Sequence, residues 1–279
     1  MSQELQITVV VENTAQGVEL LAEHGLAYWL EYDGRRILFD TGQGRVLKSN
    51  LYRMGHRPDH IDTVVLSHGH FDHTGGLADA LAEDRPVQVM LHPDALSKKY
   101  AKNRDGTSRE IGMPFPSRKA LRKPTVDLHT AEGPAQIADR LMTTGRVPLA
   151  NDFEKPSSRF FLDEACSTPD HLPDDQSIYF EGDEGTVVLL GCAHSGVINT
   201  LCHVSELTDK RPIQAVLGGM HLVDASQDRI ARTMEELRQW DLKLLAPAHC
   251  TGMPATVAMW NAFPKIIAPC HVGSKFAFR

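Results

Sequence analysis

Three histidines and one aspartate stand within six residues of one another in the first third of the chain. They are, in order, His68, His70, Asp72 and His73. The apolar, β-branched run Thr63–Ser67 directly precedes them. Imidazole and carboxylate groups are the side chains with which proteins hold zinc, iron and manganese. Gly69 supports a tight turn, in which alternate residues point to one side. A helix cap would explain Asp72 but not three histidines, so the spacing predicts a metal site.

Three more histidines follow apolar runs in the second half of the chain. The runs are Thr186–Gly191, Ile213–Gly218 and Leu242–Pro247, and the histidines that follow them are His194, His221 and His249. Runs this short and this apolar are typical of strands buried inside a layered α/β protein. We therefore expect these side chains to join the first cluster. A hydrogen-bonded structural histidine is the alternative for His194.

Two other patterns suggest different chemistry. Asp40 ends the run Arg36–Asp40 in an Asp-Thr-Gly tripeptide, which also occurs in aspartic proteases. Those enzymes need two such carboxylates sharing a proton, and the sequence contains one such tripeptide, so we discount that interpretation. Cys192, Cys250 and Cys270 lie near the proposed ligands in sequence. Their spacing is not paired and buried free thiols are common, so an iron–sulfur cluster is disfavoured.

The elements that would position these residues alternate between strands and helices. Further strands are expected at Gln6–Val11, Ala27–Tyr32, Arg36–Asp40 and Val87–His92. The pair around Asp33-Gly34 reads as a hairpin with a type I′ turn. Three sets of apolar residues at helical spacing predict amphipathic helices: Val46, Leu47, Leu51 and Met54; Val197, Ile198, Leu201 and Val204; Ile230, Met234, Leu237 and Trp240. The helix after the first cluster is expected to begin near Gly75.

One segment, residues 93–175, interrupts this order. It is rich in proline, basic and polar residues and has weak periodicity, so we interpret it as an insertion that caps the site of a single domain spanning residues 1–279. The stretch Lys98–Lys123 within it carries nine lysines and arginines against two acidic residues. Such a stretch is either a solvated face or a loop that attracts an anionic, phosphorylated substrate.

Composition limits the class of protein. The chain has 279 residues and a net charge of -7, with 42% hydrophobic and 23% charged residues. These values are typical of a soluble globular protein and argue against a general nucleic-acid binder. No apolar run approaches the ~20 residues of a membrane span, and no secretory signal is visible. Five widely spaced cysteines make a disulfide framework improbable, so a reducing cytoplasm is expected.

The motif His-x-His-x-Asp-His after a strand resembles the signature of the metallo-β-lactamase superfamily. The resemblance implies an α/β fold, a four-layer αββα sandwich with a dinuclear metal site at the edge of its two sheets. It places His68 and His70 on one metal and Asp72 and His73 on the other. His194 is then expected as the third ligand of the first metal, and His249 matches the superfamily's last ligand, a histidine just after a late strand. The resemblance also makes Asp40 a residue that orients a metal-bound histidine. The superfamily usually bridges its metals with an aspartate where this chain has His221. We expect His221 either to ligate one metal without bridging or to sit beside the metals and bind substrate.

Several short sequence segments resemble those of one subgroup of the superfamily, named for 7,8-dihydropterin-6-methyl-4-(β-D-ribofuranosyl)aminobenzene-5′-phosphate synthase. They are Glu23-His24-Gly25-Leu26, Asp175-Gln176, the stretch from Gly191 to Asn199, and the closing Ala248-His249-Cys250-Thr251-Gly252. Many members of this subgroup are described only as metal-dependent hydrolases. Within it, Glu23 and His24 could reach the rim of the metal site and bind substrate, or could form an ordinary polar loop.

These patterns predict a hydrolase in which one or two divalent metals, zinc first and manganese or iron as alternatives, activate water against an ester, amide or phosphoryl group of an anionic small molecule. Asp72 would bind metal and orient the water, and His221 or His24 would carry a proton. The main alternative is a transferase that joins a dihydropterin-methyl pyrophosphate to a ribofuranosylaminobenzene phosphate. A diiron redox protein and a metal-dependent sensor are further alternatives. No nucleic-acid or membrane partner is expected.

Overall fold

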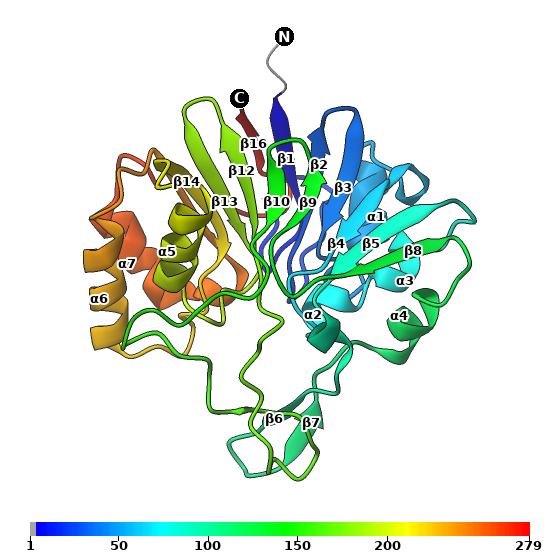
Figure 1. Cartoon of the computed structure of the whole chain (residues 1–279), viewed down its shortest axis with the longest axis horizontal. Coiled ribbons are helices and arrows are strands. Elements are labelled where there is room, and N and C mark those ends of the chain that lie inside the picture. Colours follow the sequence, from blue (N-terminus) through cyan, green and yellow to red (C-terminus); the bar gives the residue numbers. More distant parts are fainter. Residues whose placement is uncertain (1–3) are drawn as a thin grey trace.

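Two β-sheets lie face to face in the computed structural model, which describes residues 4–279 (Figure 1). The order in the seven-stranded sheet is β16 (Lys275–Phe278), β1 (Leu5–Val11), β2 (Ala27–Tyr32), β3 (Arg35–Phe39), β4 (Thr63–Val65), β5 (Val87–Leu91) and β8 (Val126–Thr130). The order in the six-stranded sheet is β15 (Leu244–Ala248), β14 (Ile213–Gly219), β13 (Gly185–Leu190), β12 (Ile178–Gly182), β10 (Leu141–Thr143) and β9 (Ala135–Ala138). Strands β3, β4, β5 and β8 run parallel, as do β13, β14 and β15.

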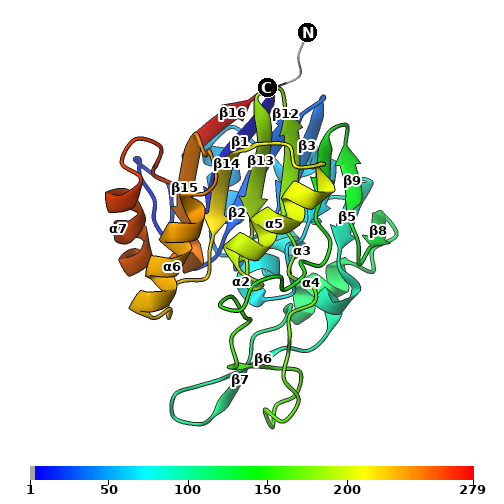
Figure 2. The same cartoon turned by 60° about the vertical axis from the view of Figure 1, so that its left-hand side comes forward.

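Helices cover the outer face of each sheet (Figures 1 and 2). Those beside the seven-stranded sheet are α1 (Leu47–Arg53), α2 (Phe71–Thr74), α3 (Leu77–Ala80) and α4 (Phe115–Ala120). Those beside the six-stranded sheet are α5 (Val197–Leu207), α6 (Gln227–Leu237) and α7 (Met253–Ala262). Short 3-10 turns lie at Pro58–His60, Pro93–Leu96 and His249–Thr251. Over residues 4–279, none of the helices is long and apolar enough to cross a membrane.

Both sheets are buried on two faces because alternate residues of each strand point in opposite directions. In β2, Tyr28 and Leu30 pack between the sheets, whereas Trp29 packs among the residues of α1 and α3. In β13, Leu189 packs between the sheets and Leu190 packs among the residues of α5 and α6. Apolar side chains therefore fill three cores: one between the two sheets, and one between each sheet and the helices that cover it. The predicted αββα sandwich is confirmed.

The predicted hairpin and helical faces are also confirmed. Asp33 and Gly34 join β2 to β3 and both have positive φ, 52° and 69°, as a type I′ turn requires. The α5 and α6 stripes are buried, although Trp240 lies beyond the end of α6 at Leu237. The helix expected near Gly75 begins earlier.

The metal-site motif is itself helical, which corrects the expected start near Gly75. Helix α2 begins at Phe71, directly after the second histidine of the motif. The His70 carbonyl accepts hydrogen bonds from the Thr74 N–H (3.0 Å) and the Thr74 hydroxyl (2.9 Å), which holds this turn in a helical conformation. Asp72 and His73 therefore leave a helical turn in fixed directions, and a separate short helix, α3, follows.

The expected insertion over residues 93–175 is smaller than its sequence suggested. Strand β8 extends the seven-stranded sheet, and β9 and β10 extend the six-stranded sheet. These strands satisfy the backbone groups that β5 and β12 would otherwise expose at a sheet edge, and the exposure of β8 explains its weak apolar pattern. What projects from the sandwich is a third sheet of β11 (Phe160–Phe161), β6 (Tyr100–Lys102) and β7 (Ser108–Glu110) (Figure 2). We call residues 98–112 and 152–170, which contain it, the cap.

A buried lysine anchors the cap to the sandwich. The Lys99 ammonium lies 2.9 Å from an Asp170 carboxylate oxygen and 2.8 Å from one of Asp174. The other oxygen of Asp174 accepts the N–H of Gly69, at 2.8 Å, inside the histidine motif. A side chain at Gly69 would collide with the Ala95 carbonyl, 2.4 Å from the position of a Cβ. The base of the cap and the metal-site turn are therefore built against each other.

Candidate metal centre

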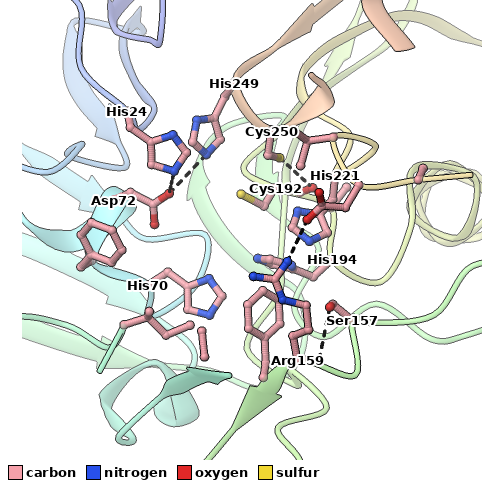
Figure 3. Close-up of a pocket in the computed structure, with 18 of the residues that line it drawn as sticks. His24, His70, Asp72, Ser157, Arg159, Cys192, His194, His221, His249 and Cys250 are labelled. Carbon is pink, nitrogen blue, oxygen red and sulfur yellow. Dashed lines mark hydrogen bonds and ion pairs between the residues drawn. The ribbon is translucent and has the colours of Figure 1, made fainter. Parts of the chain in front are cut away.

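The predicted ligands come from strand ends that meet at one edge of the sandwich. His68 follows β4, His194 follows β13, His221 follows β14, and His249 follows β15. Because β13, β14 and β15 are parallel neighbours, their carboxyl ends lie side by side. Figure 3 shows the side chains of the last three converging on a pocket with His70 and Asp72 on its opposite wall. The structure thus brings the two halves of the chain together here.

Three buried imidazoles form the first set of ligand atoms. The Nε2 atom of His68 lies 2.9 Å from Nδ1 of His70 and 3.1 Å from Nε2 of His194. Burial lowers the pKa of each of these histidines well below its usual value, which keeps the rings neutral with lone pairs available. The outer nitrogens, Nε2 of His70 and Nδ1 of His194, are buried without a hydrogen-bond partner. Three ring nitrogens this close together are better explained as ligands of one shared cation than as hydrogen-bond partners of one another.

A carboxylate and two imidazoles form the second set beside the first. The Nε2 atoms of His73 and His249 are 3.3 Å apart, and His249 Nε2 lies 3.5 Å from a carboxylate oxygen of Asp72. Burial raises the pKa of Asp72, but hydrogen bonds from His24 and His249 outweigh it and hold that pKa well below the usual value. The charged carboxylate and two nitrogen donors form a typical site for zinc or another divalent transition metal.

Hydrogen bonds fix one ring of the first set, His68, and both rings of the second, His73 and His249. Asp40 Oδ2 lies 2.7 Å from Nδ1 of His73, and the Ser67 hydroxyl lies 2.9 Å from Nδ1 of His68. Asn13 Oδ1 lies 2.9 Å from Nδ1 of His249. In each case the outer nitrogen is occupied and the inner nitrogen, Nε2, points at the site. Such partners orient metal-bound histidines, and the Asp40–His73 contact is the one that the orienting role expected for Asp40 would require.

The backbone around the site is held in uncommon conformations. Asp40, Ala193, His221 and His249 all have positive φ, between 47° and 60°. Such conformations persist where the surrounding structure enforces them, and they cluster at functional sites. Close packing adds to this, since a Cβ on Gly219 would lie 2.4 Å from the Gly191 carbonyl oxygen. The strand ends are pressed together, which sets the separation of the ligands they carry.

His221 does not lie between the two sets. Its ring centre is 4.3 Å from that of His194 and 6.1 Å from that of Phe160, which places it on the pocket wall beside the first set. The sulfur that lies among ligand atoms of both sets belongs to Cys192. A His221 ring nitrogen also forms a group with the Cys192 and Cys250 sulfurs in which all three atoms lie within 4.8 Å of one another, so both roles that the sequence left open, metal ligation and substrate contact, remain compatible with its position.

Glu23 and His24 are neighbours in the sequence, but their side chains point to different parts of the structure. The His24 ring lines the pocket, with Nε2 3.1 Å from the Asp72 carboxylate and 57% of its side chain exposed. The Glu23 carboxylate instead accepts backbone N–H groups of Gln43, Gly44 and Arg45, so it organises the loop after β3. These hydrogen bonds favour the ordinary polar loop that the sequence offered as the alternative to substrate binding by Glu23.

A pocket of about 520 Å³ opens above the metal-ligand sets. Four basic side chains line it: Arg109, Lys155, Arg159 and Arg229. Arg159 pairs with Asp224 at 3.0 Å on the pocket rim (Figure 3). The Phe160 ring, from strand β11 of the cap, lies 5.0 Å from that of His70. The pocket therefore combines cationic groups and an aromatic face above the ligand atoms.

The basic stretch Lys98–Lys123 contributes less to the pocket than its charge suggested. Arg109 is its one lysine or arginine among the pocket-lining residues of the described chain. Lys99 is buried between carboxylates, Arg118 donates to carbonyls of Leu96, Ser97 and Met113, and Lys123 donates to carbonyls near the end of α3. These three side chains are engaged by other parts of the fold and do not line the pocket, so Arg109 is the basic residue of this stretch that can contact a bound anion there.

Sequence reasoning missed several residues of the pocket. Lys155, Arg159 and Phe160 come from the second cap segment and Arg229 from α6, and no motif marks them as pocket residues. Cys192 was weighed as an iron–sulfur ligand and not as part of the histidine site, although it stands two residues before His194 at a strand end, where alternate residues point to one side.

Three comparisons with known proteins agree with this geometry. The family model of the metallo-beta-lactamase superfamily matches residues 21–249. An uncharacterized protein of Methanocaldococcus jannaschii is 34% identical over 89% of this chain and 91% of its own length. The 7,8-dihydropterin-6-methyl-4-(beta-D-ribofuranosyl)-aminobenzene-5'-phosphate synthase of the same organism is 26% identical over 92% and 90%. A crystal structure of a metal-dependent hydrolase of the beta-lactamase superfamily superposes with a TM-score of 0.82 and 28% identity, covering 98% of both chains.

Proposed function

Because the chain belongs to the metallo-beta-lactamase superfamily, we propose that it is a metal-dependent hydrolase acting on an ester, amide or phosphoryl group of an anionic small molecule. The observation that carries this proposal is the pair of adjacent ligand sets, His68, His70 and His194 beside Asp72, His73 and His249. His70, Asp72, His194 and His249 line one pocket. Divalent metal ions bound there, with zinc preferred, would activate water as a nucleophile near neutral pH and polarise the bond under attack.

The side chains around the two sets have distinct tasks in this proposal. The Asp72 carboxylate is fixed by hydrogen bonds and aimed into the site, so it can both bind metal and orient the attacking water. His221 stands on the pocket wall, where it can pass a proton to the leaving group or contact it. His24 stands on the other side of Asp72 and is open to solvent, which suits a group that exchanges protons with water.

The pocket lining supports an anionic substrate. Arginine forms paired hydrogen bonds with carboxylate and phosphate groups, and three arginines and a lysine line this pocket. The Arg159 guanidinium is held by Asp224 at the rim, and Arg229 is held by Glu154 at 3.3 Å. Phe160 offers an apolar surface beside the metal-ligand sets. An anionic group and a flat apolar group could therefore be bound together.

A transferase is the second candidate, supported by the 26% identity to the dihydropterin-methyl synthase over almost the whole chain. In that reaction an aminobenzene ring attacks a pterin-methyl carbon and pyrophosphate leaves. The same basic side chains would hold the pyrophosphate, and Phe160 would contact a ring of either substrate.

Model substrates distinguish the two candidates. The zinc-loaded protein should release nitrophenol from a nitrophenyl ester or from bis(nitrophenyl) phosphate, and the His68→Ala variant should not. The transferase candidate is supported if these substrates are inert and pyrophosphate appears only when a pterin-methyl pyrophosphate and an arylamine phosphate are both present. Release of pyrophosphate without the arylamine would instead indicate hydrolysis.

A further inference from the structure

We propose that the Cys192 thiolate is a ligand shared by both metal positions, which this chain uses in place of a bridging carboxylate. This inference rests on the proposed metal centre and names a residue that the predicted ligand sets leave out. Cys192 follows β13 after a single glycine and is buried, with 3% of its surface exposed. Its sulfur faces the pocket floor instead of the apolar core (Figure 3).

The sulfur belongs to both ligand sets by distance. It forms one group with His68 and His194 and another with His73 and His249, and within each group the ligand atoms all lie within 4.8 Å of one another. The sulfur is 3.1 Å from Nε2 of His73. An atom that is close to nitrogens of two adjacent sets lies between them, which is the location of a bridging ligand.

Charge gives a physical reason for a thiolate there. The described ligand sets contain one carboxylate, Asp72, and their other members are imidazoles, which bring no negative charge to a metal, so two adjacent divalent cations would keep most of their charge uncompensated within these sets. A negative ligand between the cations reduces their mutual repulsion. His221, at the position where a bridging aspartate was expected, is a neutral or cationic group on the wall. Cys192 supplies the missing negative charge: its S–H proton leaves to solvent as the sulfur–metal bond forms.

A thiolate ligand also restricts the choice of metal. Sulfur is a soft donor that suits zinc, cobalt and iron, whereas manganese and magnesium prefer oxygen. The inference therefore favours zinc over manganese at this centre.

Two other cysteines provide comparisons. Cys250 is buried beside Cys192, its sulfur 3.6 Å from the Cys192 carbonyl oxygen, but it shares a group only with Cys192 and His221 among the described residues. Cys202 lies on α5 and does not line the pocket. A serine at each position keeps the size of the side chain and removes the sulfur.

Cobalt substitution tests the inference, because a thiolate bound to Co²⁺ gives a charge-transfer band in the near ultraviolet that nitrogen and oxygen ligands do not give. We expect the Co²⁺-loaded protein to show this band together with visible ligand-field bands. Cys192→Ser should lose the charge-transfer band and keep the ligand-field bands, with an unchanged far-ultraviolet dichroism spectrum. The band should persist in Cys250→Ser and Cys202→Ser. X-ray absorption of the zinc protein should show a sulfur neighbour at ~2.3 Å, absent in Cys192→Ser.

The possible failures are distinguishable. Ligand-field bands without a charge-transfer band, or zinc with only nitrogen and oxygen neighbours, would overturn the inference and leave the metal centre intact. A band that survives Cys192→Ser and disappears in Cys250→Ser would assign the ligand to Cys250 and overturn it equally. Absence of all cobalt bands would overturn the metal centre itself and the inference with it.

Discussion

The Oδ2 atom of Asp40 lies 2.7 Å from Nδ1 of His73, and both side chains are buried. The other oxygen of Asp40 accepts the N–H of Ser67, and Oδ2 also accepts the Ser67 hydroxyl. Asp40 therefore connects the end of β3 to the loop after β4 and determines which nitrogen of His73 faces the metal-ligand sets. A buried carboxylate thus holds the imidazole of His73 in one orientation.

Asp40→Asn should weaken metal binding without unfolding the protein. The amide keeps the size of the side chain but loses the negative charge beside His73, and removal of such partners typically reduces metal affinity about 10–100-fold. Competition titration with a chromogenic chelator measures this. Asp62→Asn is the matched control, because Asp62 accepts the Arg36 N–H far from the ligand sets. Equal affinities in the two variants would show that Asp40 does not orient a ligand.

Arg159→Met should impair turnover of anionic substrates more than that of neutral ones. A hydrogen bond to a charged group contributes about 1.5–3 kcal/mol, so kcat/KM should fall about tenfold or more for an anionic nitrophenyl ester. A neutral ester of the same alcohol should change little. Folding should be preserved, since the Arg159–Asp224 pair is solvent-exposed. Arg122→Met removes an exposed charge outside the pocket and should leave kcat/KM unchanged for both esters. If Arg159→Met lowered kcat/KM equally for both esters, Arg159 would not bind the anionic group.

The fold and the first ligand cluster were predictable because both depend on buried strands, which can be recognised in the sequence. Strands buried on two faces must be apolar throughout, so Thr63–Val65 and Gly185–Leu190 stand out from their surroundings. Metal ligands must be held in fixed positions, and the rigid end of a buried strand holds them so. His68 and His194 accordingly lie within a few residues after these strands. The sequence does not contain the distances between strands, so the spacing of Cys192 and His194 could not show that the Cys192 sulfur lies close to both ligand sets.

The cap was predictable only in outline. Its two segments are separated in the sequence, and they meet where β11 pairs with β6. These strands have two and three residues, which is too short to show an apolar period. Arg159 and Phe160 enter the pocket by that pairing, which no local pattern reveals. The charge of Lys98–Lys123 was misleading because burial turned Lys99 into an anchor.

Lys99→Met should be strongly destabilising. The substitution leaves the buried carboxylates of Asp170 and Asp174 without their cation, and breaking a buried ion pair from one side costs about 3–5 kcal/mol. Urea unfolding of the metal-free protein measures the loss. Lys98→Met, at the exposed neighbouring position, should change stability by less than about 0.5 kcal/mol. A small effect of Lys99→Met would mean that water reaches these carboxylates.

The same lysine predicts how stability changes in alkali. Burial lowers the pKa of Lys99, but Asp174 and Asp170 outweigh this and raise it above 10.5. A group whose pKa is higher in the folded than in the unfolded protein stabilises the fold. This stabilisation is complete below the unfolded pKa and is lost as the pH rises through the folded pKa. The free energy of unfolding should therefore fall above pH 10.5, and the fall should be smaller in Lys99→Met. Parallel curves for the two proteins above that pH would contradict this assignment.

Metal content tests the central claim most directly. The purified protein, reconstituted with zinc and freed of excess by gel filtration, should contain about two zinc ions per chain, as the two ligand sets require. The double variant His68→Ala/His70→Ala should lose zinc from the first set and lose hydrolytic activity, whereas His60→Ala/His129→Ala, which removes two exposed histidines, should keep both. Full zinc content in the His68→Ala/His70→Ala protein would contradict the proposed centre.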